Sequence, residues 1–184
     1  MRFIIFSILY LVISISIFSQ DNTDHRNALE FQILNSTYTL QNGNLNEAIV
    51  VQQRWGGISS NYTEVTQIGN KNVADVHILG NRNAVRILQE NLESELGAGI
   101  GNTYRGGITG NSNLVSVAQH GSNNSITQNV TGDSYNYQVT QKGSDNKLEL
   151  DNLLPTSNPI VIEQNGEGMN LQIDNSFLPV APGQ

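Results

Sequence analysis

The residues whose chemistry stands out in this chain are carboxamides, and they recur in columns. Every second predicted strand ends in a glutamine: Gln41, Gln67, Gln89, Gln119, Gln141 and Gln164. Asparagines form another column: Asn46, Asn72, Asn102, Asn124 and Asn146. A carboxamide both donates and accepts hydrogen bonds, so identical side chains stacked one above another satisfy each other, as in cross-β ladders. A lone buried glutamine would cost free energy. The predicted chemistry is stacking, not catalysis.

Familiar catalytic and metal-binding patterns are missing from the sequence. The chain has no cysteine, which excludes disulfides and thiolate chemistry. His25, His77 and His120 lack metal-ligand spacing, and there is no Gly-x-Ser-x-Gly, phosphate-binding loop or His-Glu-x-x-His. The net charge of −7 disfavours a nucleic-acid partner. We predict a protein that is not an enzyme, with no cofactor, no metal site and no nucleic-acid partner.

Glycines mark the period of the chain. Gly110, Gly121, Gly132 and Gly143 are eleven residues apart, and Asn or Tyr follows each by three. This spacing fits one strand of about six or seven residues and a turn of about four. Alternation of apolar or carboxamide residues with others indicates strands with one buried face. Glycine takes positive φ without steric cost, so we predict turn glycines at Gly43, Gly69, Gly80, Gly110, Gly121, Gly132, Gly143 and Gly166.

The same alternation extends over twelve segments of the chain. They are Asn35–Gln41, Asn46–Gln52, Asn61–Gln67, Asn72–Ile78, Asn83–Gln89, Asn102–Ile108, Asn113–Gln119, Asn124–Val130, Tyr135–Gln141, Asn146–Asn152, Asn158–Gln164 and Met169–Asn175. The two strands of a pair differ, so the true repeat is two strands, about 22 residues. Three connections, around residues 54–60, 90–100 and 153–157, are longer. We predict that they are loops that leave the register intact.

These patterns predict an all-β protein, a flat two-sheet parallel β-solenoid of about six strand–turn–strand repeats, cross-β-like in its stacking. Like strands would lie about 4.7–4.9 Å apart, parallel and in register, in two facing sheets. The predicted residues between the sheets are Val65, Ala74, Val76, Val85, Ile87, Val115, Val117, Ile126, Val139, Leu148, Leu150, Ile160, Ile162, Leu171 and Ile173.

The first 19 residues resemble a secretory signal peptide, with Arg2 followed by an apolar run that ends near Ser19–Gln20. A membrane anchor is the alternative, although about 16 apolar residues are marginal for spanning a bilayer. Cleavage would leave 8 basic and 16 acidic residues, a net charge near −8. We predict a signal peptide at 1–19, a polar segment at 20–34, the solenoid at 35–177 and a tail at 178–184.

The repeats resemble the curlin subunits of bacterial curli fibres. Their pattern, close to Ser-x5-Gln-x-Gly-x-x-Asn-x-Ala-x3-Gln, is matched by Ser116-Val-Ala-Gln119-His-Gly121-Ser-Asn-Asn124-Ser-Ile-Thr-Gln128. Gln41-Asn-Gly43-Asn-Leu-Asn46, Gln67-Ile-Gly69-Asn-Lys-Asn72 and Gln141-Lys-Gly143-Ser-Asp-Asn146 match as well. The resemblance covers roughly residues 35–175. Departures are six predicted repeats instead of five, two long loops, and Gln164-Asn-Gly166-Glu-Gly-Met169, which lacks the asparagine.

The resemblance implies a secreted subunit that polymerises on the surface of a Gram-negative bacterium into functional amyloid fibres of the biofilm matrix. Such subunits leave the cell through a dedicated outer-membrane pore with accessory proteins. Their partners are further copies and a sibling curlin; one subunit type builds the fibre and another nucleates it, and both types stay open here. The architecture alone also favours end-to-end stacking, because open solenoid ends are edge strands that template further pairing.

Two other classes compete with the fibre subunit. One is a soluble secreted β-solenoid that binds a ligand or surface, such as carbohydrate or ice. The other is a polysaccharide-acting β-helix enzyme, which would have three sheets and carboxylates in a groove. Outward residues such as Tyr62, Glu64 and Thr66 do not form the Thr-x-Thr array of an ice-binding face. Trp55 lies in an insertion and would be either an adhesive contact or a loop packing residue.

Overall fold

The fold consists of short strands joined by tight turns. The computed structural model describes residues 35–55, 60–91, 100–151 and 159–174. The strands are β1 (Ser36–Asn42), β2 (Glu47–Gln53), β3 (Tyr62–Ile68), β4 (Val73–Leu79), β5 (Ala84–Glu90), β6 (Thr103–Thr109), β7 (Leu114–Ser122), β8 (Ser125–Thr131), β9 (Asn136–Ser144), β10 (Lys147–Asp151), β11 (Ile160–Glu167) and β12 (Asn170–Asp174). The predicted signal peptide, N-terminal segment and C-terminal tail lie outside the described residues. The described segments contain no helix with the length and hydropathy needed to cross a bilayer.

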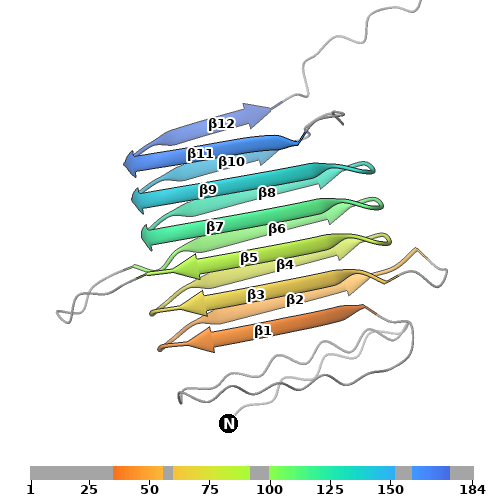
Figure 1. Cartoon of the computed structure of the whole chain (residues 1–184), viewed down its shortest axis with the longest axis horizontal. Helices are drawn as coiled ribbons and strands as arrows, with labels where there is room; N and C mark the ends of the chain where they lie inside the picture. The colour runs from red at the N-terminus through yellow and green to blue at the C-terminus, as the bar shows by residue number, and fades with distance from the viewer. Residues whose placement is uncertain (1–34, 56–59, 92–99, 152–158, 175–184) are drawn as a thin grey trace, which may run out of the picture.

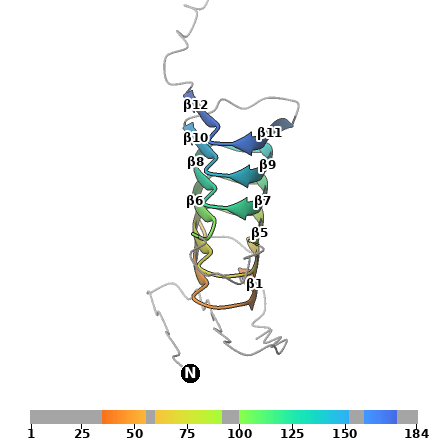
Figure 2. The same cartoon turned by 90° about the vertical axis from the view of Figure 1, so that its left-hand side faces the viewer.

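The strands form two six-stranded parallel sheets. One sheet has the order β1-β3-β5-β7-β9-β11 and the other the order β12-β10-β8-β6-β4-β2. Consecutive strands therefore alternate between the sheets, and each pair adds one rung to the stack (Figure 1). Seen along the strands, the two sheets face each other across a thin interior (Figure 2). This arrangement confirms the predicted two-sheet parallel β-solenoid.

The register is kept through every rung, including those that flank the insertions. Gln41 pairs with Gln67 although residues 54–60 intervene, and Gln89 pairs with Gln119 across residues 92–99. Eleven of the twelve predicted segments overlap an observed strand that begins one residue later, and the strand in Asn158–Gln164 begins two residues later. A one-residue slip would turn every inward side chain outward, so the insertions are confined to the corners.

The turns use two left-handed backbone positions, and only one of them was predicted. All eight predicted turn glycines have positive φ, for example 109° at Gly121. Two residues later a second left-handed residue follows, and it is usually not glycine: Leu45, Lys71, Arg82, Ser112, Asn123, Ser134 and Asp145, with φ of 55–63°. A non-glycine residue costs about 1–2 kcal/mol in this conformation, so the repeated corner must be held by other interactions.

The core between the sheets is apolar in the centre and amide-lined at its edges. Most predicted core residues are buried, and Ile160 and Ile173 pack against them. Leu171 pairs with Leu148 of the previous rung but stays 37% exposed, because no described strand covers the last rung. Tyr104 was not predicted as core; its ring fills the space over Gly106, where a Cβ would overlap the phenol.

The tight stacking of turns gives a first testable prediction. Gly121→Ala should destabilise the protein by about 2 kcal/mol or more, because it combines strained positive φ with an overlap between the new Cβ and the Gly143 carbonyl oxygen. Gly107→Ala is the matched control: Gly107 lies outside the left-handed region, and its new Cβ meets only the Asn129 side chain. Chemical denaturation of freshly purified monomer measures both. Equal losses for the two variants would contradict this account of the corner.

Candidate functional site

The six predicted glutamines form one continuous inward row. Each Nε2 donates to the Oε1 of the next glutamine towards the C-terminus, at 2.6, 2.9, 2.9, 2.9 and 2.7 Å from Gln41 through Gln67, Gln89, Gln119 and Gln141 to Gln164. Five of the six are at most 2% exposed, and Gln41, on the first rung, is partly buried. The ladder therefore has a direction, with donors pointing towards one end of the solenoid.

From Gln67 onward, the second hydrogen of each ladder amide binds a carbonyl at the start of a strand in the facing sheet. Gln67 Nε2 donates to the Glu47 carbonyl at 2.8 Å, and Gln119 Nε2 donates to the Thr103 carbonyl at 3.0 Å. Gln164 repeats the contact with the Lys147 carbonyl at 3.0 Å. The row thus pairs rung with rung and also joins one sheet to the other. No buried ladder amide hydrogen is left without an acceptor, which removes the main cost of burying it.

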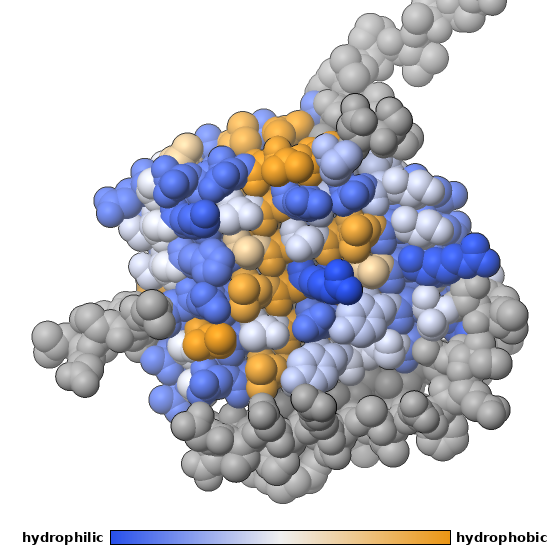
Figure 3. All heavy atoms as spheres, viewed as in Figure 1, coloured by the Kyte–Doolittle hydropathy of each residue, from blue (hydrophilic) through white to orange (hydrophobic). Residues whose placement is uncertain are grey.

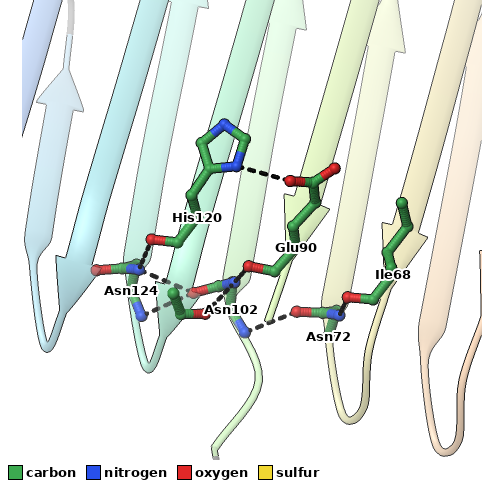
Figure 4. Close-up of polar contacts among 7 residues, drawn as sticks. Ile68, Asn72, Glu90, Asn102, His120 and Asn124 are labelled. Carbon is green, nitrogen blue, oxygen red and sulfur yellow. Dashed lines mark hydrogen bonds and ion pairs between the residues drawn. The ribbon is translucent and has the colours of Figure 1, made fainter. Parts of the chain in front are cut away.

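The predicted asparagines form a second ladder along the corner between the odd and even strands. The backbone N–H and Nδ2 of Asn124 both donate to Asn102 Oδ1, at 3.1 and 3.0 Å, and Asn146 binds Asn124 Oδ1 in the same way. In three of these turns, those of Asn72, Asn124 and Asn146, Nδ2 also reaches a carbonyl four residues earlier, as from Asn72 to Ile68 at 3.1 Å (Figure 4). These asparagines therefore close their own turns and dock them on the previous ones.

The opposite corner carries an equivalent ladder, outside the predicted site. Asn61, Asn83 and Asn113 each donate through N–H and Nδ2 to the asparagine below, beginning at Asn35. The ladder ends at Tyr135, whose N–H donates to Asn113 Oδ1 at 3.0 Å and whose hydroxyl donates to the Thr131 carbonyl at 3.1 Å. The sequence carries the signal, because asparagine opens most of the odd segments too.

Further amides that sequence reasoning missed lie in the turns. Asn91 takes the glycine column of the turn after β5; it is 2% exposed and its Oδ1 accepts from Asn70 N–H at 2.7 Å. The spacing Gln89-Glu-Asn91, in place of Gln-x-Gly, could have identified it. At an exposed corner, Asn111 N–H donates to Asp133 Oδ1 at 2.6 Å. Stacking of polar side chains therefore extends beyond the two predicted columns.

The outer faces of the described strands carry paired charges. Arg86 lies 3.5 Å from Glu64 and over the Tyr62 ring, and Lys142 lies 3.3 Å from Glu163. His77 and His120 both point outward, beside Asp75 and Glu90 respectively. In the described part of the chain, no three His, Asp or Glu side chains gather in a way that could hold a metal ion.

The two ends of the solenoid expose complementary halves of the glutamine ladder. At the first rung, Gln41 Oε1 receives no donor from the described residues. At the last rung, Gln164 Nε2 donates only to the Lys147 and Met169 carbonyls, with no further Oε1 above it in the described chain. One end therefore offers an acceptor and the other a donor in the same column.

Comparison of the chain with known proteins found no match. No family model matches the chain, and neither the curated proteins nor the solved structures contain a significant match. The evidence for function is therefore the β-solenoid and its stacked amides.

Buried tyrosines are the titratable groups inside the solenoid. Tyr104 is fully buried and donates to Gln128 Oε1 at 3.3 Å, while Tyr137 is buried and stacks on Tyr135 at 5.5 Å. Burial raises the pKa of the Tyr104 phenol above its usual value. Burial, followed by the nearby Tyr135, does the same to the pKa of Tyr137. Both phenols therefore lose their protons at a higher pH in the folded chain than in the unfolded chain.

The glutamine row gives a second prediction. Gln119→Leu should lower the free energy of unfolding by about 2–4 kcal/mol, because it removes the bonds to Gln141 and the Thr103 carbonyl and leaves buried polar atoms unpaired. Gln138→Leu, one rung on and on the outer face of β9, should change it by less than about 0.5 kcal/mol. Denaturant unfolding of both monomers measures the difference. A Gln119→Leu variant as stable as the control would contradict a stabilising ladder.

The tyrosines give a third prediction, on pH. Above the unfolded-state pKa of about 10, the unfolded chain loses phenolic protons that the folded chain retains, so the unfolding free energy falls as pH rises. Tyr104→Phe should therefore reduce the loss of stability between about pH 8 and 11, whereas Tyr38→Phe, on the outer face of β1, serves as the control. The readout is the denaturation midpoint at both pH values. An unchanged pH dependence in Tyr104→Phe would refute the role of burial.

Proposed function

We propose that this protein is a structural subunit of extracellular, curli-like amyloid fibres and that it assembles by end-to-end stacking of solenoids. The observation that carries the proposal is the pair of open ends, on which the columns of one end match those of the other. The proposal assigns the chain a role in cell adhesion and the biofilm matrix, and no catalytic role. It includes secretion to the cell surface and a sibling subunit as a second partner.

Continuing the register of the rungs by one step defines the junction between copies. The column that contains Gln164 begins at Gln41, so the Gln164 amide of one copy would face Gln41 Oε1 of the next. On the other sheet, Leu171 and Ile173 would lie over Ala48 and Val50 of the next copy. The junction thus reproduces the glutamine and apolar contacts made inside each copy.

The charges at this junction are compatible with stacking. Glu163 shares a column with Leu40, Asp174 with Val51, and Asn170 with Glu47. No two like charges among these columns would meet between copies. Like charges directly opposite each other in a sheet are destabilising, so this pattern favours head-to-tail stacking.

Burial of apolar surface would add to the stability of the junction. Leu171 is 37% and Met169 41% exposed at the last rung, although their columns are buried or half-buried elsewhere. A second copy would bring Leu171 into the same environment as Leu148, which is fully buried. Burial of an apolar side chain contributes about 1.5–3 kcal/mol. Contact with a second copy would therefore stabilise this end of the solenoid relative to its exposure to water.

The rival function, a soluble solenoid that binds ice or carbohydrate through a flat face, receives less support. Figure 3 shows hydrophilic and hydrophobic side chains interleaved over the outer surface of the β1–β11 sheet. Neighbouring rungs place Glu64 beside Arg86, and Thr66 beside Leu88. A regular lattice of one residue type, which would match a repeating ligand, is not present on this face of the described rungs.

A fourth prediction tests assembly itself. The predicted mature chain, incubated at micromolar concentration, should form thioflavin-positive fibres with parallel β-structure. Ile173→Lys should slow fibre growth more than about tenfold: the ammonium reaches water in the monomer but would be buried without a partner at the junction. Gln172→Lys, exposed on the neighbouring position, is the control and should grow normally. Electron microscopy and a thioflavin time course report both.

Persistence of the wild-type chain as a monomer for days would refute the proposed function. Fibres that grow equally fast from Ile173→Lys and wild type would refute end-to-end stacking as their mode of growth. Addition of the chain as a seed to a sibling subunit separates the two subunit types: acceleration at low ratio marks a nucleator, and rapid self-assembly marks the main fibre component.

A further inference from the structure

The last rung departs from the repeat at two positions that both lie on its open side. Met169 occupies the corner column of Asn46, Asn72, Asn102, Asn124 and Asn146. Pro159 occupies the column of Ser36, Tyr62, Ala84 and Leu114, directly before β11. Both residues are exposed. Since the proposed function places a second copy on this surface, the two departures act at the junction.

Met169 removes an acceptor that every other described turn of this corner provides. Within the solenoid each asparagine Oδ1 accepts the backbone N–H of the next rung: Asn46 Oδ1 accepts from Asn72 N–H at 3.0 Å, and Asn124 Oδ1 accepts from Asn146 N–H at 3.2 Å. In most rungs it also accepts that residue's Nδ2, as from Asn146 to Asn124 at 3.0 Å. The Met169 N–H still donates to Asn146 Oδ1 at 3.1 Å, but its thioether, a weak acceptor, cannot receive the next rung.

Pro159 removes a backbone donor at the other corner. Ser36, Tyr62, Ala84 and Leu114 each donate their N–H to the carbonyl of the next rung, at 2.9, 2.8, 2.8 and 2.7 Å. The same position of the last rung is proline, which has no N–H. Proline on an edge strand is a known means of limiting further pairing. An incoming Asn35 carbonyl would therefore lack its donor at this place.

The first rung keeps the residues that the last rung lacks. Asn46 N–H has no acceptor among the described residues, while Asn46 Oδ1 accepts both donors of Asn72. Its carbonyl would face the Asn170 N–H of a preceding copy, as Asn72 faces Glu47 N–H at 2.8 Å. The two ends are thus unequal: the N-terminal face is a complete half of the junction and the C-terminal face an incomplete one.

We propose that Met169 and Pro159 weaken the C-terminal face and so limit the addition of one copy to another at this junction. The Gln164–Gln41 contact still sets the register of the junction. A partner solenoid whose last rung carries asparagine and no proline would bind the intact N-terminal face more tightly than a copy of this chain does. The inference rests on the proposed function and concerns the strength and partner preference of the same junction.

The experiment compares end-addition by wild type, Met169→Asn, Pro159→Ser and the double variant of the mature chain. The residual soluble concentration at equilibrium with fibres should fall by roughly tenfold for Met169→Asn, because two hydrogen bonds are restored at each junction. Pro159→Ser, which restores one, should lower it by roughly threefold, and the double variant should combine both effects. Met169→Leu and Val161→Thr, on the same rung without a ladder group, should stay within about twofold of wild type.

A double-mutant cycle separates the junction from the monomer. Met169→Asn also adds a donor towards Asn146 within the chain, so its gain is measured again in the Asn46→Ala background. Asn46→Ala removes the Nδ2 donor of residue 46 and keeps its backbone N–H. A gain that shrinks there therefore arises from the contact between copies; a gain of undiminished size arises within the monomer and overturns the inference. Equal soluble concentrations for Met169→Asn and Met169→Leu also overturn it and leave the proposed function intact. Absence of fibres from every variant refutes the proposed function itself.

Discussion

The structure depends on one constraint: a carboxamide inside a dry interior must find partners for its two hydrogens and its oxygen. Gln89 meets this need through Gln67, Gln119 and backbone carbonyls of the facing sheet. Those partners exist only if the neighbouring rungs are parallel and in register. An apolar column tolerates a slip of register along the strand at modest cost, whereas an amide column does not, because each lost pair leaves a buried polar group that costs about 1–3 kcal/mol. The glutamines and asparagines therefore specify the stacking, and the apolar residues between them fill the remaining space.

The corners show how this constraint outweighs local preference. Lys71 adopts φ of 59°, which costs about 1–2 kcal/mol for a residue with a Cβ. In that conformation its N–H donates to the Asn44 carbonyl at 2.9 Å, and the following Asn72 binds Asn46 through two hydrogen bonds. Together these bonds stabilise the corner by more than the strain, since each contributes about 0.5–1.5 kcal/mol. The backbone strain is thus local to the turn, and the hydrogen bonds that offset it come from the adjacent rung.

The sequence alone predicted the positions at which a residue type repeats and failed at positions where the residue type varies. The Gln and Gly columns, the strand segments and the inward positions follow from period and alternation, because each is enforced at every rung. The second left-handed position was missed, since Leu45, Lys71 and Asp145 share no chemical feature and only the backbone reveals it. Tyr104 was missed because its place in the core depends on Gly106 of the same strand, which leaves room for the ring. Asn91 was hidden by the insertion that follows it. The exposure of Leu171 reflects its position at an end, which no pattern within the repeat encodes.

A ladder of stacked amides leaves unpaired groups at its last rung, and this feature connects folding of the monomer with assembly of the fibre. Each rung pairs the hydrogen-bonding groups of the rung before it and presents the same kind of groups on its far side. The interaction that stabilises the monomer is therefore the one that a second copy would make. Substitutions inside the stack must therefore change folding and association together. Only substitutions in the terminal rungs can change association without changing folding to the same extent. Gln164 and Met169 have one neighbouring rung within the described chain and would face the partner on the other side. Selection for controlled assembly would accordingly act on the last rung, where Pro159 and Met169 replace the residues of their columns.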